Sequence, residues 1–500
     1  MNTPNWISRS VSRWRPTPSS DGNRPSAPGN LAQNAIKSAA GLELKGTKEG
    51  PKPSARSTRE RLLATLRQGD EALSPRMLRR TLEELRAIID SSISEVEGGR
   101  RAQAIAAWYR GATLARRRDL WSLMSEQFTA DLARVSAAQA KFAAAVGTPD
   151  EAVAEVNYRR ATVSPRRRLL QRFSVNPDGI AFLIQMRSEF QPFLKSDRRL
   201  MALDVEMEYM FSTWFDVGFL ELQRISWDSP ASLIEKLIEY EAVHDIKSWA
   251  DVKNRLDSDR RCYGFFHPRM PGVPLIFVEV ALADAIASDI TPLLDETAAP
   301  TDLTAATTAI FYSISNTQTG LRGVSFGDSL IKRVVETLKL EFPGLKTFVT
   351  LSPIPGFRAW LHKNAAATLE RLDAKELAAL GRAVGFEPPG AVHFLEAAER
   401  AAALPDTSVV RRVMLGAAAH YLARAMDGDK PLDPVARFHL GNGARVERLN
   451  WGADPSVKGS SQSYGLMVNY LYDLKRLDKN REQLTRGEVP VSGALRSLLS

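Results

Sequence analysis

The chain has 500 residues, of which 44% are hydrophobic and 25% charged, a composition typical of globular proteins. This length exceeds one ordinary hydrophobic core, so at least two domains are expected. A membrane-spanning helix is not indicated, because the most apolar stretch, 275–287, contains Glu279 and Asp284. The single cysteine, Cys262, excludes a disulfide within the chain and any zinc site built on several thiolates.

The positive charge is concentrated at the start of the chain. Residues 1–56 hold nine Lys or Arg against three acidic residues, and so carry +6 of the net +9. Because this segment is rich in Pro, Ser, Asn and Gly, we expect it to be disordered. It lacks the apolar core of a secretory signal, and a solvated tail is favoured over a surface anchor. The rest of the chain is nearly neutral, which argues against nucleic acid as its partner.

From residue 57 to 208 the sequence predicts helices. Ala, Leu, Arg and Glu dominate, and β-branched residues are sparse. Apolar residues recur at three- and four-residue spacing within five stretches: 74–89, 101–125, 127–146, 151–172 and 178–194. Acids, histidines and glycines do not gather into a site here, so we expect a helical bundle that serves packing or oligomerisation.

After residue 209 aromatic residues appear, and helix and strand patterns mix over 209–500. Three runs rich in apolar and β-branched residues predict strands: 273–282, 308–315 and 346–352. Helical patterns return at 328–341, 364–404 and 407–427. Residues 438–472 read as loop and short strand. The expected fold class is α+β, with a helical bundle followed by a mixed-sheet domain.

The loop after the second predicted strand is rich in glycine. Gly320, Gly323 and Gly327 would let backbone amides approach a ligand closely. Asp328 or Ser329 could cap the next helix, whose free N–H groups favour an anion such as phosphate. The spacing fits neither a Walker loop nor a dinucleotide fingerprint. Glycine turns that merely join a strand to a helix explain the pattern equally well.

Two polar residues stand out by position. Ser352 ends the third predicted strand, and Pro353 and Pro355 would hold its hydroxyl on a rigid turn. Without a Gly-x-Ser-x-Gly elbow, the residues alone favour a turn serine over an acyl-enzyme nucleophile. His439 precedes a Gly-Asn-Gly turn, but composition does not single it out among six histidines. No grouping of His, Asp or Glu has metal-ligand spacing, so no metal is predicted.

Long motifs run from the helical part of the chain almost to its end. They are 214–220 (WFDVGFL), 260–263 (RRCY), 311–324 (FYSISNTQTGLRGV), 330–335 (LIKRVV), 351–357 (LSPIPGF), 433–440 (DPVARFHL) and 465–472 (GLMVNYLY). Together they closely resemble the malonyl-CoA decarboxylase family. The resemblance implies an N-terminal helical oligomerisation domain, associated as a tetramer, before a catalytic domain of the GNAT acetyltransferase type. In a GNAT fold, a strand leads into a loop that binds the pyrophosphate of coenzyme A.

The resemblance also implies the site residues. The expected catalytic residues are Ser352, His439 and Tyr472. The expected substrate-binding residues are Arg322, Gly323, Val324, Ser325, Phe326, Gly327, Asp328 and Asn442. Malonyl-CoA would lose CO2 to give the enolate of acetyl-CoA, which His439 would protonate.

Further expectations concern partners and location. Coenzyme A is part of the substrate, and no separate cofactor is expected, because the thioester itself accepts the electrons. The alternatives are an acyl-CoA-dependent N-acyltransferase on the same fold and a non-catalytic coenzyme A sensor. The chain does not end in the Ser-Lys-Leu signal of peroxisomal proteins, so we expect a cytoplasmic protein.

Overall fold

The structure, a computed structural model, describes residues 72–324, 326 and 330–499. The expectations for the tail, residues 1–56, and for Ser325, Gly327 and Asp328 lie outside the described residues. All described residues belong to one compact unit, Ala55–Ser500. Within the described ranges, no helix is both long and apolar enough to cross a membrane.

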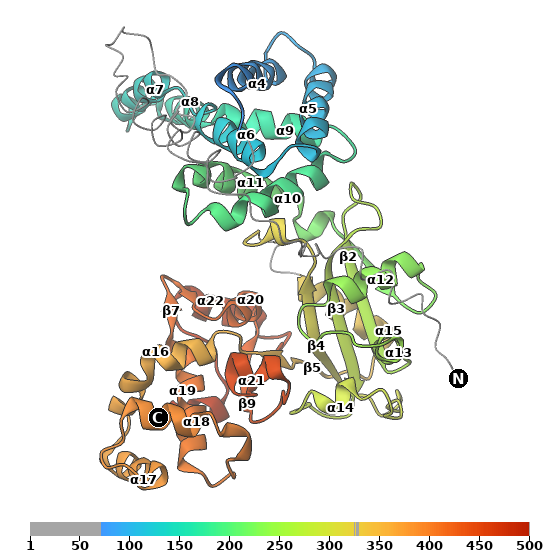
Figure 1. The fold of residues 1–500 in the computed structure, drawn as a ribbon, viewed down its shortest axis with the longest axis vertical. Helices are drawn as coiled ribbons and strands as arrows, with labels where there is room; N and C mark the ends of the chain where they lie inside the picture. The colour runs from blue at the N-terminus through green and yellow to red at the C-terminus, as the bar shows by residue number, and fades with distance from the viewer. Residues whose placement is uncertain (1–71, 325, 327–329, 500) are drawn as a thin grey trace, which may run out of the picture. The chain divides into compact units, whose positions relative to one another are not determined.

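The first described part of the chain is helical, as predicted (Figure 1). Its α-helices are α4 (Pro75–Ile88), α5 (Glu95–Arg110), α6 (Leu114–Glu126), α7 (Leu132–Ala145), α8 (Glu151–Thr162), α9 (Pro165–Ser174), α10 (Gly179–Phe190) and α11 (Met201–Trp214). Helix α4 begins where Ser74 accepts a hydrogen bond from the Met77 amide and Pro75 occupies the first turn. Its buried side chains recur with helical spacing: Leu78, Leu82, Leu85 and Ile88.

Two of the predicted stretches each contain two helices. Within 101–125, α5 ends at Gly111, a residue that disfavours helix, and α6 starts after Thr113. Within 151–172, α8 stops before Ser164, and Pro165 opens α9 because proline suits only the first turn of a helix. The proposed domain boundary at 208/209 falls inside α11, six residues before that helix ends at Trp214.

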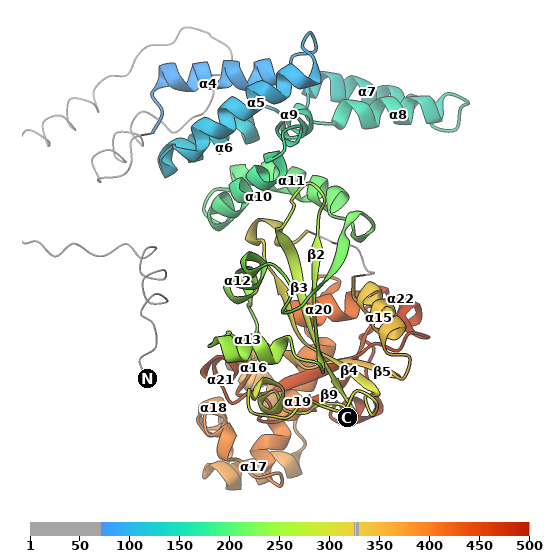
Figure 2. The same cartoon turned by 90° about the vertical axis from the view of Figure 1, so that its right-hand side faces the viewer.

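The second part contains a mixed sheet, as predicted. Its strands are β1 (Glu221–Ile225), β2 (Arg260–Phe266), β3 (Pro274–Ala283), β4 (Thr308–Asn316), β5 (Thr347–Thr350), β6 (Ser352–Pro353), β9 (Arg445–Asn450) and β10 (Met467–Leu471). In the described part of the chain the strand order is β1-β2-β3-β4-β5-β10-β6, with β9 also paired to β10. Figure 2 shows β2, β3 and β4 side by side. The three strands predicted from sequence are confirmed.

The layout around β4 is the strand, loop, helix and strand expected from sequence. β4 leads through the short helix η5 (Thr319–Leu321) and the loop into α15 (Leu330–Glu341), and β5 then runs parallel to β4. The β4–β5 ladder ends at Phe311 and Thr350. Beyond that point β4 continues to the loop, whereas the chain after β5 pairs with β10.

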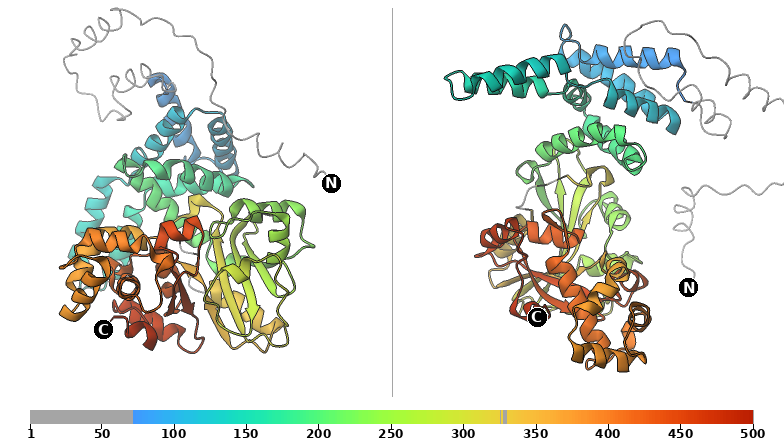
Figure 3. Two further views of the ribbon diagram at one scale, coloured as in Figure 1. Left: turned by 60° about the horizontal axis from the view of Figure 1, so that its bottom comes forward. Right: turned by 90° about the vertical axis from the view of Figure 1, so that its left-hand side faces the viewer.

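The remaining helices flank or follow the strands. They are α12 (Ala231–Tyr240), α13 (Trp249–Arg255), α14 (Thr291–Leu294), α16 (Phe357–Glu370), α17 (Ala374–Val384), α18 (Ala391–Ala398), α19 (Val409–Arg424), α20 (Pro434–Gly441), α21 (Val457–Ser463), α22 (Leu477–Thr485) and α23 (Gly493–Arg496). Figure 3 shows α16 to α19, in orange, as one group of packed helices. Strands β7 (Met426–Asp427) and β8 (Lys430–Pro431) form a separate hairpin.

The reading of 438–472 as loop and short strand is incomplete, because α20 and α21 also fall in this region. Both helices are too short for a periodic apolar stripe to reveal them. The start of α20 is nevertheless encoded locally. Asp433 accepts hydrogen bonds from the amides of Val435 and Ala436, and Pro434 takes the first turn. His439 therefore lies on a helix rather than on a turn.

A buried ion cluster ties α13 to the middle of the sheet. Arg255 is 1% exposed and binds two carboxylates, Asp251 at 2.7 Å and Glu279 at 2.8 Å. Glu279 lies on β3 and is completely buried. Carboxylates that burial has removed from water need a cationic partner, because an unpaired buried charge costs several kcal/mol.

Replacement of Arg255 by Met should therefore destabilise the fold by about 3–5 kcal/mol, since two carboxylates lose their counter-charge. Denaturant unfolding measures this change. Arg224→Met is the matched control: Arg224 pairs with Glu341 at 3.3 Å, but its side chain is 48% exposed, so the loss should be about 0–1 kcal/mol. Equal losses in the two variants would contradict the importance of the buried cluster.

Candidate functional site

The imidazole of His439 lies between two hydroxyl groups. Its Nε2 is 3.2 Å from Oγ of Ser352, and its Nδ1 is 2.7 Å from Oη of Tyr472. Ser352 in turn donates a hydrogen bond to Oγ1 of Thr350 at 2.9 Å. The structure thus brings the three predicted catalytic side chains into one hydrogen-bonded row, Tyr472–His439–Ser352–Thr350, called the hydroxyl–imidazole row below.

Strand β10 positions both hydroxyls that contact the imidazole. Ser352 lies on β6 opposite Val468 of β10. Tyr472 directly follows the last residue of β10, and its amide donates to the Phe348 carbonyl at 2.9 Å. The imidazole comes from the other direction, on α20. The row is therefore held by sheet pairing on one side and by a capped helix on the other.

Burial sets the protonation state of the row. His439 is 3% exposed, and its ring stacks on Tyr470 with centroids 4.6 Å apart. Burial lowers the pKa of His439 to about 3, because the charged imidazolium loses its hydration. Burial likewise raises the pKa of Tyr472 well above its usual value. At neutral pH the free protein therefore carries a neutral imidazole and a protonated phenol.

The neighbours of the imidazole suit either of its protonation states. A neutral imidazole has one nitrogen that donates and one that accepts, whereas imidazolium donates from both. Hydroxyl groups can donate or accept by rotation, so Ser352 and Tyr472 can satisfy both forms. The row can therefore take up and pass on a proton without leaving a buried polar atom unpaired.

Thr350 is a member of the row that the sequence reasoning did not identify. Its Oγ1 accepts from Ser352 and also from the backbone amide of Tyr470, at 3.0 Å. The sequence did contain a signal, because Thr350 precedes Ser352 by two residues in extended chain, a spacing that puts side chains on the same face.

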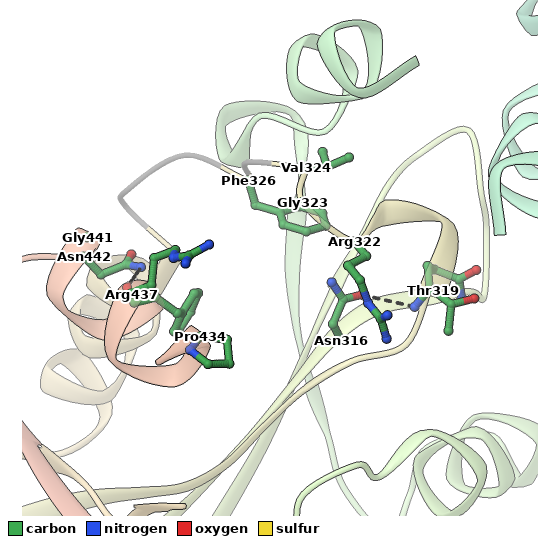
Figure 4. Close-up of a pocket in the computed structure, with 12 residues that line it drawn as sticks. Asn316, Thr319, Arg322, Gly323, Val324, Phe326, Pro434, Arg437, Gly441 and Asn442 are labelled. Carbon is green, nitrogen blue, oxygen red and sulfur yellow. Dashed lines mark hydrogen bonds between the residues drawn. The ribbon is translucent and has the colours of Figure 1, made fainter. Parts of the chain in front are cut away.

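A cavity of about 630 Å³ opens beside α20. Figure 4 shows its two walls, one from α20 and one from the end of β4 and the following loop. Five predicted substrate-binding residues line it: Arg322, Gly323, Val324, Phe326 and Asn442. The lining residues not predicted from sequence are Asn316, Gln318, Thr319, Pro434, Arg437, Phe438 and Gly441. Helix α20 thus contributes both His439 and one wall of the cavity.

The described lining of the cavity carries positive charge, and one of its residues has a buried acceptor without a partner. Arg322 and Arg437 are its charged residues, and no acidic side chain is among the described lining. Asn442 is 7% exposed, and its Nδ2 donates to the Phe438 carbonyl at 2.8 Å. Its Oδ1 is buried without a hydrogen-bond partner. The positive charge of the described lining therefore suits an anionic ligand.

Metal binding has no visible framework in the described ranges, where no three His, Cys, Asp or Glu residues gather in a way that could hold an ion. The absence of a metal stays a prediction.

Fold and site define the class of this protein: a helical region followed by a mixed-sheet domain, with the hydroxyl–imidazole row on the helix that also lines a positively charged cavity. The model of the malonyl-CoA decarboxylase C-terminal domain matches residues 218–500, and that of the N-terminal domain matches residues 128–215. The chain belongs to the malonyl-CoA decarboxylase family, which confirms the resemblance noted from its motifs.

Individual relatives agree with this assignment. Mitochondrial malonyl-CoA decarboxylase of Mus musculus is 38% identical over 344 residues, which cover 65% of this chain and 69% of that protein. The crystal structure of malonyl-CoA decarboxylase from Cupriavidus metallidurans is 44% identical, with a TM-score of 0.69, covering 85% of this chain and 100% of that one. The enzyme structure from Agrobacterium vitis is 39% identical, with a TM-score of 0.73 and coverages of 84% and 100%.

The low pKa of His439 can be tested by NMR. In the free protein the His439 ring signals should not titrate between about pH 5 and pH 8, because burial holds the imidazole neutral until about pH 3. Histidine labelling measures the signals, and His439→Gln assigns them. A midpoint near pH 6.5 would contradict the neutral, desolvated state.

The same shift has a consequence for stability. The folded pKa lies below that of an unfolded histidine, so only the unfolded chain binds this proton as pH falls below about 6.5. As pH falls from about 6.5 to about 3, proton uptake by this histidine in the unfolded chain should therefore progressively lower the free energy of unfolding.

Proposed function

We propose that this protein decarboxylates malonyl-CoA to acetyl-CoA and CO2. The observation that carries the proposal is the hydroxyl–imidazole row, whose imidazole stands on the helix that also walls the positively charged cavity. Family membership supports it, because the mouse relative is named for this activity.

Coenzyme A would occupy the cavity with its phosphates near the two arginines. Arg322 and Arg437 supply positive charge, and the backbone amide of Gly323 could donate to a phosphate oxygen. Asn442 Oδ1 would accept from an amide N–H of the pantetheine arm. Ser325, Phe326, Gly327 and Asp328 belong to the same proposed loop site. This orientation directs the thioester along α20 toward His439.

The chemistry requires the enzyme to stabilise negative charge. When the C–C bond breaks, its electrons enter the thioester carbonyl and CO2 departs, leaving the enolate of acetyl-CoA. Donors aimed at the enolate oxygen are worth about 3–4 kcal/mol each in a dry site. Hydroxyls of Ser352 or Tyr472 are candidates for this role. The thioester acts as the electron sink, so the reaction itself calls for no further cofactor.

The substrate would also charge the histidine. A malonyl carboxylate next to His439 favours the imidazolium form and raises its pKa from the low value of the free protein. One proton from solvent would then reside on His439 before the C–C bond breaks. After CO2 leaves, imidazolium would return this proton to the α-carbon of the enolate. The balance is one malonyl-CoA and one proton in, one acetyl-CoA and one CO2 out.

Two further features belong to the proposal. Self-association through the helical region, as a tetramer, and a cytoplasmic location are both expectations from sequence. The mouse and goose relatives carry the word mitochondrial in their names.

The deciding experiment is incubation of the purified protein with malonyl-CoA alone. Acetyl-CoA and CO2 should form in equal amounts, measured by chromatography and by CO2 capture. An N-acyltransferase would leave malonyl-CoA intact until an amine acceptor is added. A coenzyme A sensor would bind the thioester, with a heat measurable by calorimetry, but release no CO2.

Removal of the row should lower turnover more than it alters binding. His439→Asn should reduce kcat by about 10²–10⁴-fold with a small change in KM, because proton transfer is lost. Ser352→Ala and Tyr472→Phe should each reduce kcat as well, since each removes one hydroxyl beside the imidazole.

The matched control for these variants is Ser125→Ala. Ser125 is also a buried serine, but it lies on α6 and donates to the Arg199 carbonyl. It should change stability without changing kcat. Unchanged turnover in His439→Asn would remove this residue from the mechanism, and a loss of stability alone in Ser352→Ala would restore the turn-serine interpretation.

A further inference from the structure

Arg187 connects the helical region to the loop that lines the cavity. It lies on α10, is 1% exposed, and its Nη1 donates to the carbonyls of Gly320 at 2.9 Å and Arg322 at 3.0 Å. Its Nε donates to Asp204 of α11 at 2.8 Å. A single buried guanidinium therefore holds two loop carbonyls and is itself oriented by a carboxylate.

The loop is also packed directly against α10. A Cβ atom placed on Gly320 would lie 2.0 Å from the carbonyl oxygen of Ile184, a distance that no side chain can occupy. Only glycine lets the turn η5 approach the helix backbone this closely. Packing and hydrogen bonding thus independently attach the same turn to α10.

The hydrogen bond from Arg187 to the Arg322 carbonyl fixes the direction of the Gly323 amide. In a trans peptide the C=O and N–H groups point in opposite directions. Because the Arg322 carbonyl points at Arg187, the N–H of Gly323 points away from it. Gly323 lines the cavity, and its amide has no hydrogen-bond partner among the described residues. A cation on the carbonyl also polarises this peptide and strengthens its N–H as a donor.

We propose that Arg187 is a positioning residue for substrate binding: it orients the Arg322–Gly323 peptide so that its N–H meets a phosphate oxygen of the coenzyme A thioester. The helical region then sets the affinity for substrate in addition to any role in assembly. The identity of the anion rests on the proposed function, whereas the contact between α10 and the loop does not.

Arg166 is a matched control for Arg187. It too is a buried arginine of the helical region, 4% exposed, that donates to backbone carbonyls. Its acceptors, Met124 and Ala202 among them, all lie on the helices and not on the loop. Arg166→Gln should therefore loosen the helical region without disturbing the orientation of the Gly323 amide.

The test compares Arg187→Gln and Arg166→Gln. The first should raise KM for malonyl-CoA, and Kd for coenzyme A by calorimetry, about tenfold, a typical size for coupling between sites. Its kcat should change less than about twofold, because the hydroxyl–imidazole row is untouched. Arg187→Lys keeps the positive charge but loses the planar guanidinium that donates to several acceptors at once, and it should give an intermediate KM. Arg166→Gln should lower Tm and leave KM and Kd unchanged.

Loss of Arg187 leaves Asp204 buried and unpaired, so the charge-balanced double variant Arg187→Gln/Asp204→Asn keeps the test decisive if the single variant does not fold. A folded double variant with unchanged KM and Kd would overturn the proposal, as would an equal rise in both constants in Arg166→Gln. If the wild-type protein binds coenzyme A but releases no CO2, the proposed function fails, while the calorimetric comparison of these variants still decides the role of Arg187.

Discussion

The pairing of β10 with the chain on both sides of Leu351 is the constraint on which the site depends. β10 pairs with β5 through Val349 and with β6 through Ser352. This single strand therefore fixes the position of the Ser352 hydroxyl. Tyr472, which directly follows the end of the strand, is positioned by it as well. The space between the two hydroxyls accepts one imidazole, which α20 supplies. A shift of β10 by one residue would turn every side chain to the other face and dismantle the row.

The fold could be predicted from sequence where apolar residues form long, unambiguous patterns. The run 273–282 is buried along nearly its whole length as β3, and α4 shows its helical spacing and its Ser-Pro start. Helices α20 and α21 were missed, because eight and seven residues are too few for a period to be visible. The start of α20 was nevertheless predictable, because Asp433 is a preferred N-cap residue and Pro434 suits the first turn of a helix.

The site was predictable only through the resemblance. Ser352 and His439 are 87 residues apart in sequence, and Tyr472 lies another 33 beyond, so no local pattern links them. The arginine on α10 is more distant still, 133 residues before Gly320. Contacts of this kind depend on how elements pack, which periodicity does not encode. Thr350 is the exception, because its spacing from Ser352 places both on one face of the chain.

Because His439 is neutral in the free protein, the site holds no buried imidazolium before a ligand binds. A free enzyme with a permanent imidazolium at this depth would bear a large desolvation cost. Hydroxyl neighbours avoid this cost, since they bind either form of the ring. In the proposed mechanism, the carboxylate of malonyl-CoA brings the counter-charge, and the proton taken from solvent leaves on the product. In that mechanism the carboxylate of the ligand, rather than a resident counter-ion, would govern when the proton is present.

The glycine contact between η5 and α10 also bears on how such chains can be recombined. A chimera that joined the helical region of this chain to the sheet of a relative would place a foreign loop against α10. If that loop lacked glycine at position 320, its Cβ would clash with the backbone of α10. The transferable module thus extends upstream of the strands to include α10 and α11, whatever boundary sequence families draw between the two halves.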